Sequence, residues 1–144
     1  MIELAKEGRF VAEWLAPWLA DTALARSPEG LGGRTYTDPA NLTDEAITTY
    51  LSPLVRSPGW TDAFAAALAP NVLEGVESKL RESRVPARIV RGTGDTIFSP
   101  DSPGYLDRTF GNSRGVRYVE GAKLFYPEEY PHVIADEARS LWSV

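Results

Sequence analysis

The sequence predicts an α/β fold, in which a helical segment is followed by a terminal β-α-β-α unit with parallel strands. Three observations lead to this prediction. Before Pro86, apolar residues recur at intervals of three and four, as they do on amphipathic helices. After Pro86, short β-branched runs alternate with helical patterns, and the connections between them are short. The chain is therefore predicted to divide into a helical segment, residues 1–84, and a strand-bearing segment, residues 85–144.

The first helix is predicted from Ile2 to about Ala25. Its apolar residues form one broad stripe, namely Leu4, Phe10, Val11, Trp14, Leu15, Trp18 and Leu19. Pro17 lies inside this stripe and lacks the N–H group that an interior helical position needs. The residue before a proline also disfavours helical backbone, so we expect a break or kink at Ala16. One kinked helix and two shorter helices both fit the pattern.

Further helices are predicted ahead of Pro86, separated by turn signals. Residues 27–41 are rich in glycine and proline and are predicted to form a loop whose glycines allow unusual backbone angles. Thr43 is the expected N-cap of a helix that runs to about Val55. Two more helices are expected, one from Trp60 to Leu68 and one from Leu73 to Leu80, the second with basic residues at its end.

The strand-bearing segment alternates strands with helices. Strands are predicted at residues 86–91 and 116–119, and helices from Asp101 to about Phe110 and from Pro131 to Trp142. A strand, a helix and a second strand with short connections form a right-handed βαβ unit, which makes the two strands parallel. Residues 92–95, with the sequence GTGD, are the expected turn after the first strand.

Composition and charge disfavour several classes of function. The formal net charge of −5 argues against a nucleic acid or an anionic membrane surface as partner, because both select a basic face. The chain has no cysteine and a single histidine, which leaves no thiolate site and no plausible zinc site. No apolar run approaches the roughly 20 residues that span a bilayer, and the charged start is not a secretory signal. We therefore expect a cytoplasmic protein with no metal, no cofactor and neither nucleic acid nor membrane as partner.

Two segments resemble hallmarks of the α/β-hydrolases. Residues 85–100, VPARIVRGTGDTIFSP, are similar to the family's penultimate strand and the acid-bearing turn after it. Residues 121–131, GAKLFYPEEYP, are similar to the family's G-H-F-x-x-E-E-x-P segment before the last helix. The helical stretch before Pro86 lies where haloalkane-dehalogenase-like and epoxide-hydrolase-like members carry a helical cap. The resemblance thus implies a partial α/β-hydrolase fold, namely the cap and the last two strands.

Asp95 occupies the position that this resemblance assigns to the catalytic acid. Such a carboxylate would orient an imidazole and stabilise its cation. The alternative is that Asp95 caps its own turn by accepting hydrogen bonds from nearby N–H groups. The family's catalytic histidine is replaced by Leu124, and no strand before the cap carries a nucleophile elbow. His132, the single histidine, lies in the first turn of the predicted last helix, where a surface residue is expected.

Three other groups of residues resemble functional sites but have simpler structural explanations. Residues 111–115, GNSRG, match G-x-S-x-G, yet a helix precedes them and a strand follows, which reverses the order in a nucleophile elbow. Glu128 and Glu129 could act as paired carboxylates, although favourable charge at a helix N-terminus also explains them. Three tryptophans either line a cap pocket for a small apolar ligand or simply pack, namely Trp14, Trp18 and Trp60.

The resemblance implies a hydrolase that attacks its substrate with a nucleophile and then hydrolyses the covalent intermediate. This chain supplies at most the acid and the cap, so we expect no hydrolase activity from it alone. Three functions remain open: an inactive hydrolase fragment, one half of a split hydrolase completed by another chain, and a non-catalytic ligand-binding or assembly module. Two parallel strands leave a sheet open, so we expect as partner a second copy in a homo-oligomer or a missing N-terminal hydrolase half.

Overall fold

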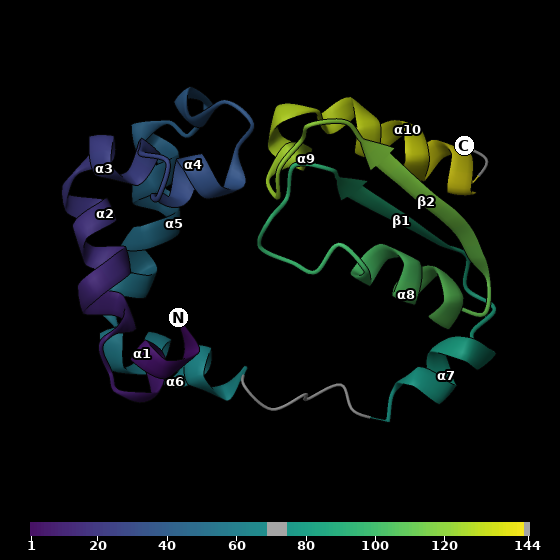
Figure 1. The fold of residues 1–144 in the computed structure, drawn as a ribbon, viewed down its shortest axis with the longest axis horizontal. Coiled ribbons are helices and arrows are strands. Elements are labelled where there is room, and N and C mark those ends of the chain that lie inside the picture. Colours follow the sequence, from purple (N-terminus) through teal and green to yellow (C-terminus); the bar gives the residue numbers. More distant parts are fainter. Residues whose placement is uncertain (69–74, 143–144) are drawn as a thin grey trace. The chain divides into compact units, whose positions relative to one another are not determined.

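The computed structural model describes residues 1–68 and 75–142, and it has a mixed α/β architecture with a two-stranded parallel sheet (Figure 1). The chain forms two compact units. Among the described residues, the first unit contains residues 1–33 and 38–68, and the second contains residues 34–37 and 75–142. No helix in these ranges is long and apolar enough to cross a membrane.

The stretch predicted as the first helix is divided into four shorter pieces. They are α1 (Ile2–Lys6), the π-helix η1 (Val11–Leu15), α2 (Ala16–Ala20) and α3 (Thr22–Arg26). The breaks fall at Gly8, whose φ is +70°, and at Asp21, whose carboxylate accepts hydrogen bonds from the first turn of α3. A break or kink was expected at Ala16; the helix does not end there, because η1 runs directly into α2, and the change from π-helix to α-helix falls at this residue. A π-turn is wider than an α-turn, and it accommodates the missing N–H of Pro17 without ending the helix.

The prediction of a loop over residues 27–41 is wrong in part, because this stretch contains α4 (Leu31–Thr35) and the 3-10 helix η2 (Pro39–Asn41). None of its glycines has a positive φ. They allow close approach instead. A Cβ atom on Gly30 would lie 2.2 Å from the carbonyl oxygen of Leu24, and one on Gly33 would lie 2.3 Å from that of Ser27.

The next two helices confirm the predictions for this part of the chain. Helix α5 (Asp44–Arg56) begins after Thr43, whose hydroxyl accepts a hydrogen bond of 3.1 Å from the N–H of Ala46. Helix α6 (Pro58–Ala67) follows and packs against α1. The buried side chains of η1 and α5 form much of the interior of this unit, namely Val11, Leu15, Ile47 and Leu51. Asp62 of α6 is buried with them and accepts a hydrogen bond of 3.1 Å from the N–H of Val11, at the start of η1.

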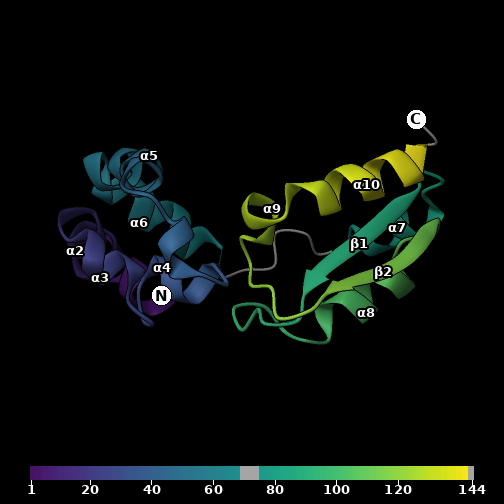
Figure 2. The ribbon, with the colours of Figure 1, turned by 90° about the horizontal axis from the view of Figure 1, so that it is seen from above.

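The second unit is a parallel β-α-β-α arrangement, as predicted. Its elements are α7 (Glu77–Glu82), β1 (Ala87–Gly92), α8 (Ser102–Thr109), β2 (Ser113–Val119), α9 (Tyr126–Glu129) and α10 (Pro131–Trp142). Ile89 lies opposite Val116 in the sheet, and Gly92 lies opposite Val119. Helix α8 covers one face of the sheet and α10 covers the other (Figure 2). The short α9 was not predicted, and Leu73, where the helix before the sheet was expected to begin, lies outside the described residues.

Candidate functional site

Two sequence motifs that lie far apart in the chain meet at the end of β1. The turn after β1 packs against the segment after β2, where the N–H of Gly94 donates a hydrogen bond of 2.9 Å to the carbonyl of Ala122. A Cβ atom on Gly92 would lie 2.2 Å from that same carbonyl oxygen, and one on Gly94 would lie 2.4 Å from the carbonyl oxygen of Gly121. Both glycines are therefore needed for the close approach of two backbone segments. This packing places Asp95 and Leu124 beside one pocket.

The carboxylate of Asp95 is buried and both of its oxygens have partners. Its Oδ1 accepts a hydrogen bond of 2.7 Å from the N–H of Ile97, which confirms the expected capping of its own turn. Its Oδ2 lies 3.0 Å from a guanidinium nitrogen of Arg91, which precedes it by four residues and lies near the end of β1. The side chains of Asp95 and Arg91 are 3% and 13% exposed, so this ion pair is largely withdrawn from water.

Arg91 also binds the backbone of the loop that follows Asp95. Its second guanidinium nitrogen donates hydrogen bonds to the carbonyl oxygens of Asp95, at 3.0 Å, and of Phe98, at 2.9 Å. A planar guanidinium can make several such bonds at fixed angles, which a lysine in its place could not. Sequence analysis missed this residue. The available signal was a cation four residues before the acid, inside a strand that is otherwise predicted to be buried.

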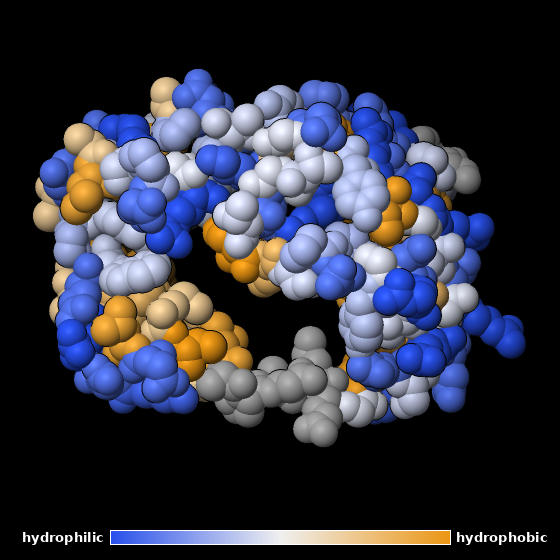
Figure 3. Space-filling model, viewed as in Figure 1, coloured by the Kyte–Doolittle hydropathy of each residue, from blue (hydrophilic) through white to orange (hydrophobic). Residues whose placement is uncertain are grey.

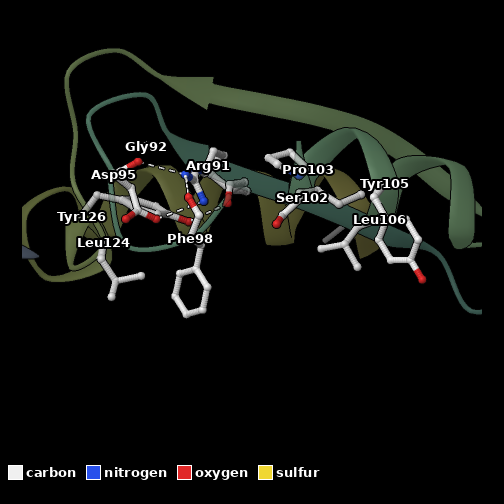
Figure 4. A pocket seen from close by; sticks show the side chains of 12 residues that line it. Arg91, Gly92, Asp95, Phe98, Ser102, Pro103, Tyr105, Leu106, Leu124 and Tyr126 are labelled. Atoms are coloured by element: carbon white, nitrogen blue, oxygen red, sulfur yellow. Dashed lines mark hydrogen bonds and ion pairs between the residues drawn. The ribbon is translucent and has the colours of Figure 1, made fainter. Parts of the chain in front are cut away.

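The pocket beside this ion pair has a volume of about 460 Å³ (Figure 4). Its walls come from β1, the loop after it, α8 and the segment before α9. Most of the lining is apolar, and it includes Ile89, Phe98, Pro103, Leu106 and Leu124. In the close view, the side chains of Phe98, Leu106 and Leu124 point to the same side of the strand as the pocket. The volume and lining are those of a site for a small apolar molecule.

Tyr126 closes the pocket near the end of β1. Its hydroxyl donates a long hydrogen bond of 3.4 Å to the carbonyl oxygen of Val90. Burial raises the pKa of Tyr126 above its ordinary value near 10, so its hydroxyl stays neutral at pH 7. The polar side chains of the lining are thus the phenols of Tyr105 and Tyr126, the hydroxyl of Ser102 and the ion pair of Arg91 and Asp95. Within the part of the chain that the structure describes, no imidazole lines this pocket.

His132 and Ser113 lie away from the pocket and are structural residues. His132 is exposed in the first turn of α10, with its ring edge-on to that of Tyr130. Ser113 begins β2 after α8, which confirms that the GNSRG string is a helix-to-strand turn. Its hydroxyl donates to a carboxylate oxygen of Asp107 at 2.5 Å and accepts from the N–H of Gly115.

The adjacent carboxylates of Glu128 and Glu129 hold a distant segment of the chain. The hydroxyl of Tyr36 donates to Glu128 at 2.5 Å, and the N–H of Thr37 donates to Glu129 at 2.9 Å. Tyr36 is 1% exposed, and its ring lies edge-on against that of Phe125. The two glutamates therefore act as anchors for residues 34–37 and are not placed as an acid–base pair.

The three tryptophans belong to the first unit and do not converge on one site there. Trp14 and Trp18 are half-buried neighbours whose ring centres are 5.7 Å apart. Trp60 is 75% exposed on α6 and stacks on Phe64 at 6.2 Å. Apolar surface gathers over α1 and α6 in the space-filling view (Figure 3). Their proposed role in ligand binding stays a prediction.

Two further findings concern the site, namely the lack of a metal-binding cluster in the described ranges and the comparison with known proteins. Among the described residues, no group of three or more histidine, cysteine, aspartate or glutamate side chains is arranged to hold a metal ion. Comparison with known proteins gives no match to a family model, a curated protein or a solved structure. The resemblance to α/β-hydrolases therefore stays a prediction from the sequence, and the chemistry of the site has to be argued from its own geometry.

Proposed function

We propose that the second unit binds a small apolar molecule in the pocket beside Asp95 and does not hydrolyse it. One observation carries this proposal, namely that Arg91 occupies the carboxylate of Asp95 while Leu124 stands at the same pocket. An acid in a catalytic triad accepts the N–H of an imidazole and stabilises its cation. Here each oxygen of Asp95 already has a partner from the chain itself, Arg91 supplies the positive charge, and the neighbouring side chain Leu124 is an aliphatic one.

The proposal keeps the α/β-hydrolase resemblance as a statement about ancestry and architecture. The order of acid-bearing turn, helix, strand and final helix is the one that the resemblance implies. The chemistry differs, because hydrolysis through a covalent intermediate needs an activated nucleophile and a base within hydrogen-bonding reach. Ser102 is the serine in the lining, and His132 lies exposed on α10 outside the lining.

A split hydrolase is the second function that the sequence leaves open. A histidine from another chain would then have to share the carboxylate of Asp95 with Arg91 or displace Arg91 from it. Displacement would break a largely buried ion pair, whose two side chains are 3% and 13% exposed. The arrangement around Arg91 thus favours the binding function over the catalytic one.

A titration with the neutral fluorescent probe N-phenyl-1-naphthylamine tests the binding function. We expect saturable binding by the full chain, and at least about tenfold weaker binding by Leu106→Trp, which fills the pocket. Phe64→Ala, on the exposed face of α6, is the matched control and should bind as the unchanged protein does. Circular dichroism confirms that each variant is folded. Equal affinity in the Leu106→Trp variant, or no saturable binding at all, would overturn the proposal.

The absence of hydrolysis is tested separately with 4-nitrophenyl acetate. We expect release of nitrophenol at the rate seen without protein. Turnover above that rate that is lost in Asp95→Asn would show that the acid is catalytic and that the proposed function is wrong.

A further inference from the structure

Strand β1 has one edge that no strand covers in the described part of the chain. Its other edge pairs with β2, toward which the N–H groups of Ala87 and Thr93 donate. Because backbone groups alternate along a strand, the N–H and C=O groups of Arg88, Val90 and Gly92 point the opposite way. An open row of this kind is a template for pairing with another strand.

Apolar hollows flank this open edge on both faces of the sheet. On the α8 side lies the pocket described above, which Val90 and Gly92 help to line. On the α10 side lies a second hollow of about 160 Å³, lined by Val90, Ile134 and Trp142 among others. Ile134 and Trp142 are both exposed. A strand added to this edge would therefore find apolar surface above and below it.

The outer edge of β2 is different, because it carries the features that prevent such pairing. Between the pairs Ala87–Ser113 and Ile89–Val116, one residue of β1 lies opposite two residues of β2. β2 therefore contains a bulge, and Gly115 has a φ of +84° there. The neighbouring Arg114 is exposed. Bulges and charged side chains are the usual protection of an edge strand. The strand β1 has arginines too, but Arg91 is turned inward to Asp95 and Arg88 to Glu137.

We propose that β1 pairs with β1 of a second copy of this chain, antiparallel, about a two-fold axis at Val90. The strand complements itself in this register. Val90 meets Val90 of the second copy, while Arg88 meets Gly92, so that no arginine faces an arginine. An isologous contact of this kind closes after two copies and leaves no open β1 edge.

The backbone groups at this edge remain suited to a ladder. Within residues 1–68 and 75–142, the carbonyl of Val90 accepts the 3.4 Å bond from Tyr126, and the carbonyl of Gly92 accepts a bond of 3.3 Å from the N–H of Asp95. Each carbonyl oxygen has two lone pairs, so a second donor can be added to both. The second copy would also bound the open side of the pocket on the α8 face. The pairing itself uses backbone groups and is tested without any ligand.

A cysteine cross-link tests the axis, and the chain offers a clean background because it has no cysteine of its own. Directly opposite residues in a hydrogen-bonded antiparallel pair have Cα atoms about 5.5 Å apart, within the range that a disulfide spans. Val90→Cys should therefore give a disulfide-linked dimer under mild oxidation, and Tyr118→Cys, exposed on β2, should give little. Equal cross-linking of both variants, or none at Val90→Cys, would contradict the axis.

Sedimentation equilibrium tests the same inference without a cross-link. The unchanged protein should form a species of twice 15.8 kDa at micromolar concentration. Val90→Lys places two like charges opposite each other and should raise the dissociation constant at least about tenfold, whereas Tyr118→Lys should not change it. A monomer of 15.8 kDa at tens of micromolar, or a dimer that Val90→Lys leaves intact, would overturn the proposal.

Discussion

The ion pair between Arg91 and Asp95 should be a major source of stability in the second unit. Replacement of Arg91 by Met keeps most of the side-chain length but removes three interactions at once: the 3.0 Å ion pair and the bonds to the carbonyls of Asp95 and Phe98. It leaves a carboxylate that is 3% exposed without its cation. Removing one partner of a buried ion pair costs about 3–5 kcal/mol of unfolding free energy. Because Arg91 is partly exposed, we expect a loss of about 3 kcal/mol, at the lower end of this range.

Replacement of Asp95 by Asn should cost less, about 1–2 kcal/mol. The amide oxygen can still accept the hydrogen bond from Ile97, and Arg91 keeps its bonds to two carbonyls. The double variant should be less destabilised than the sum of the two single variants, with a coupling of about 1–2 kcal/mol, because the residues share one interaction.

Urea unfolding followed by circular dichroism measures these differences. The midpoint should fall furthest in Arg91→Met, less in Asp95→Asn, and the double variant should lie closer to Arg91→Met than additivity requires. A loss below about 1 kcal/mol in Arg91→Met, or strict additivity, would show that the pair is solvent-screened and that the argument from its burial is wrong.

Two further predictions concern the packing after β1 and the pH dependence of stability. Gly92→Ala should lower the free energy of unfolding by about 3 kcal/mol, because its Cβ would lie 2.2 Å from a backbone carbonyl, and urea unfolding measures the loss. Gly59→Ala in the first turn of α6 is the control: nothing lies within 4 Å of its Cβ, so its stability should stay the same or rise by up to about 1 kcal/mol. Glu137 accepts hydrogen bonds from Arg117 and Arg88, which hold its pKa below the ordinary 4.5. The stability from this acid is therefore fully present above pH 4.5 and is lost as pH falls through the lowered pKa. Glu137→Gln should cost about 2 kcal/mol at pH 7 and flatten the decline below pH 4.5, and an unchanged acid limb in thermal melts would argue against it.

The elements that the sequence predicted well are those whose signals are local. Helix α5 has its N-cap at Thr43 and a regular apolar stripe, and α10 begins at Pro131, where a proline fits the first turn of a helix. The two strands follow from short β-branched runs after Pro86. In each case one stretch of chain carries enough information to fix its own conformation.

The errors arose where the detailed path of the backbone, more than the residue types, decides the structure. Gly30 and Gly33 look like loop glycines, but they serve close packing against backbone that lies earlier in the chain. Pro17 is a residue that usually breaks a helix, but here the π-helix η1 continues into α2 without a break. Arg91 lies four residues before Asp95, and its role depends on how the turn after β1 brings the two side chains together. The predicted acid position at Asp95 was found in a turn of the expected kind, while its chemistry is set by a neighbour that sequence analysis did not consider.

The anchoring of residues 34–37 has a consequence for the order in which the chain folds. Tyr36 and Thr37 bind glutamates that lie 92 residues further along the sequence. On a ribosome, at about 5–20 residues per second, the partners of Tyr36 are synthesised roughly 5–20 s after it. The helices of the first unit can form during that interval from short-range contacts. The second unit, in contrast, must wait for α9, so it is expected to be completed after the helices of the first unit have formed.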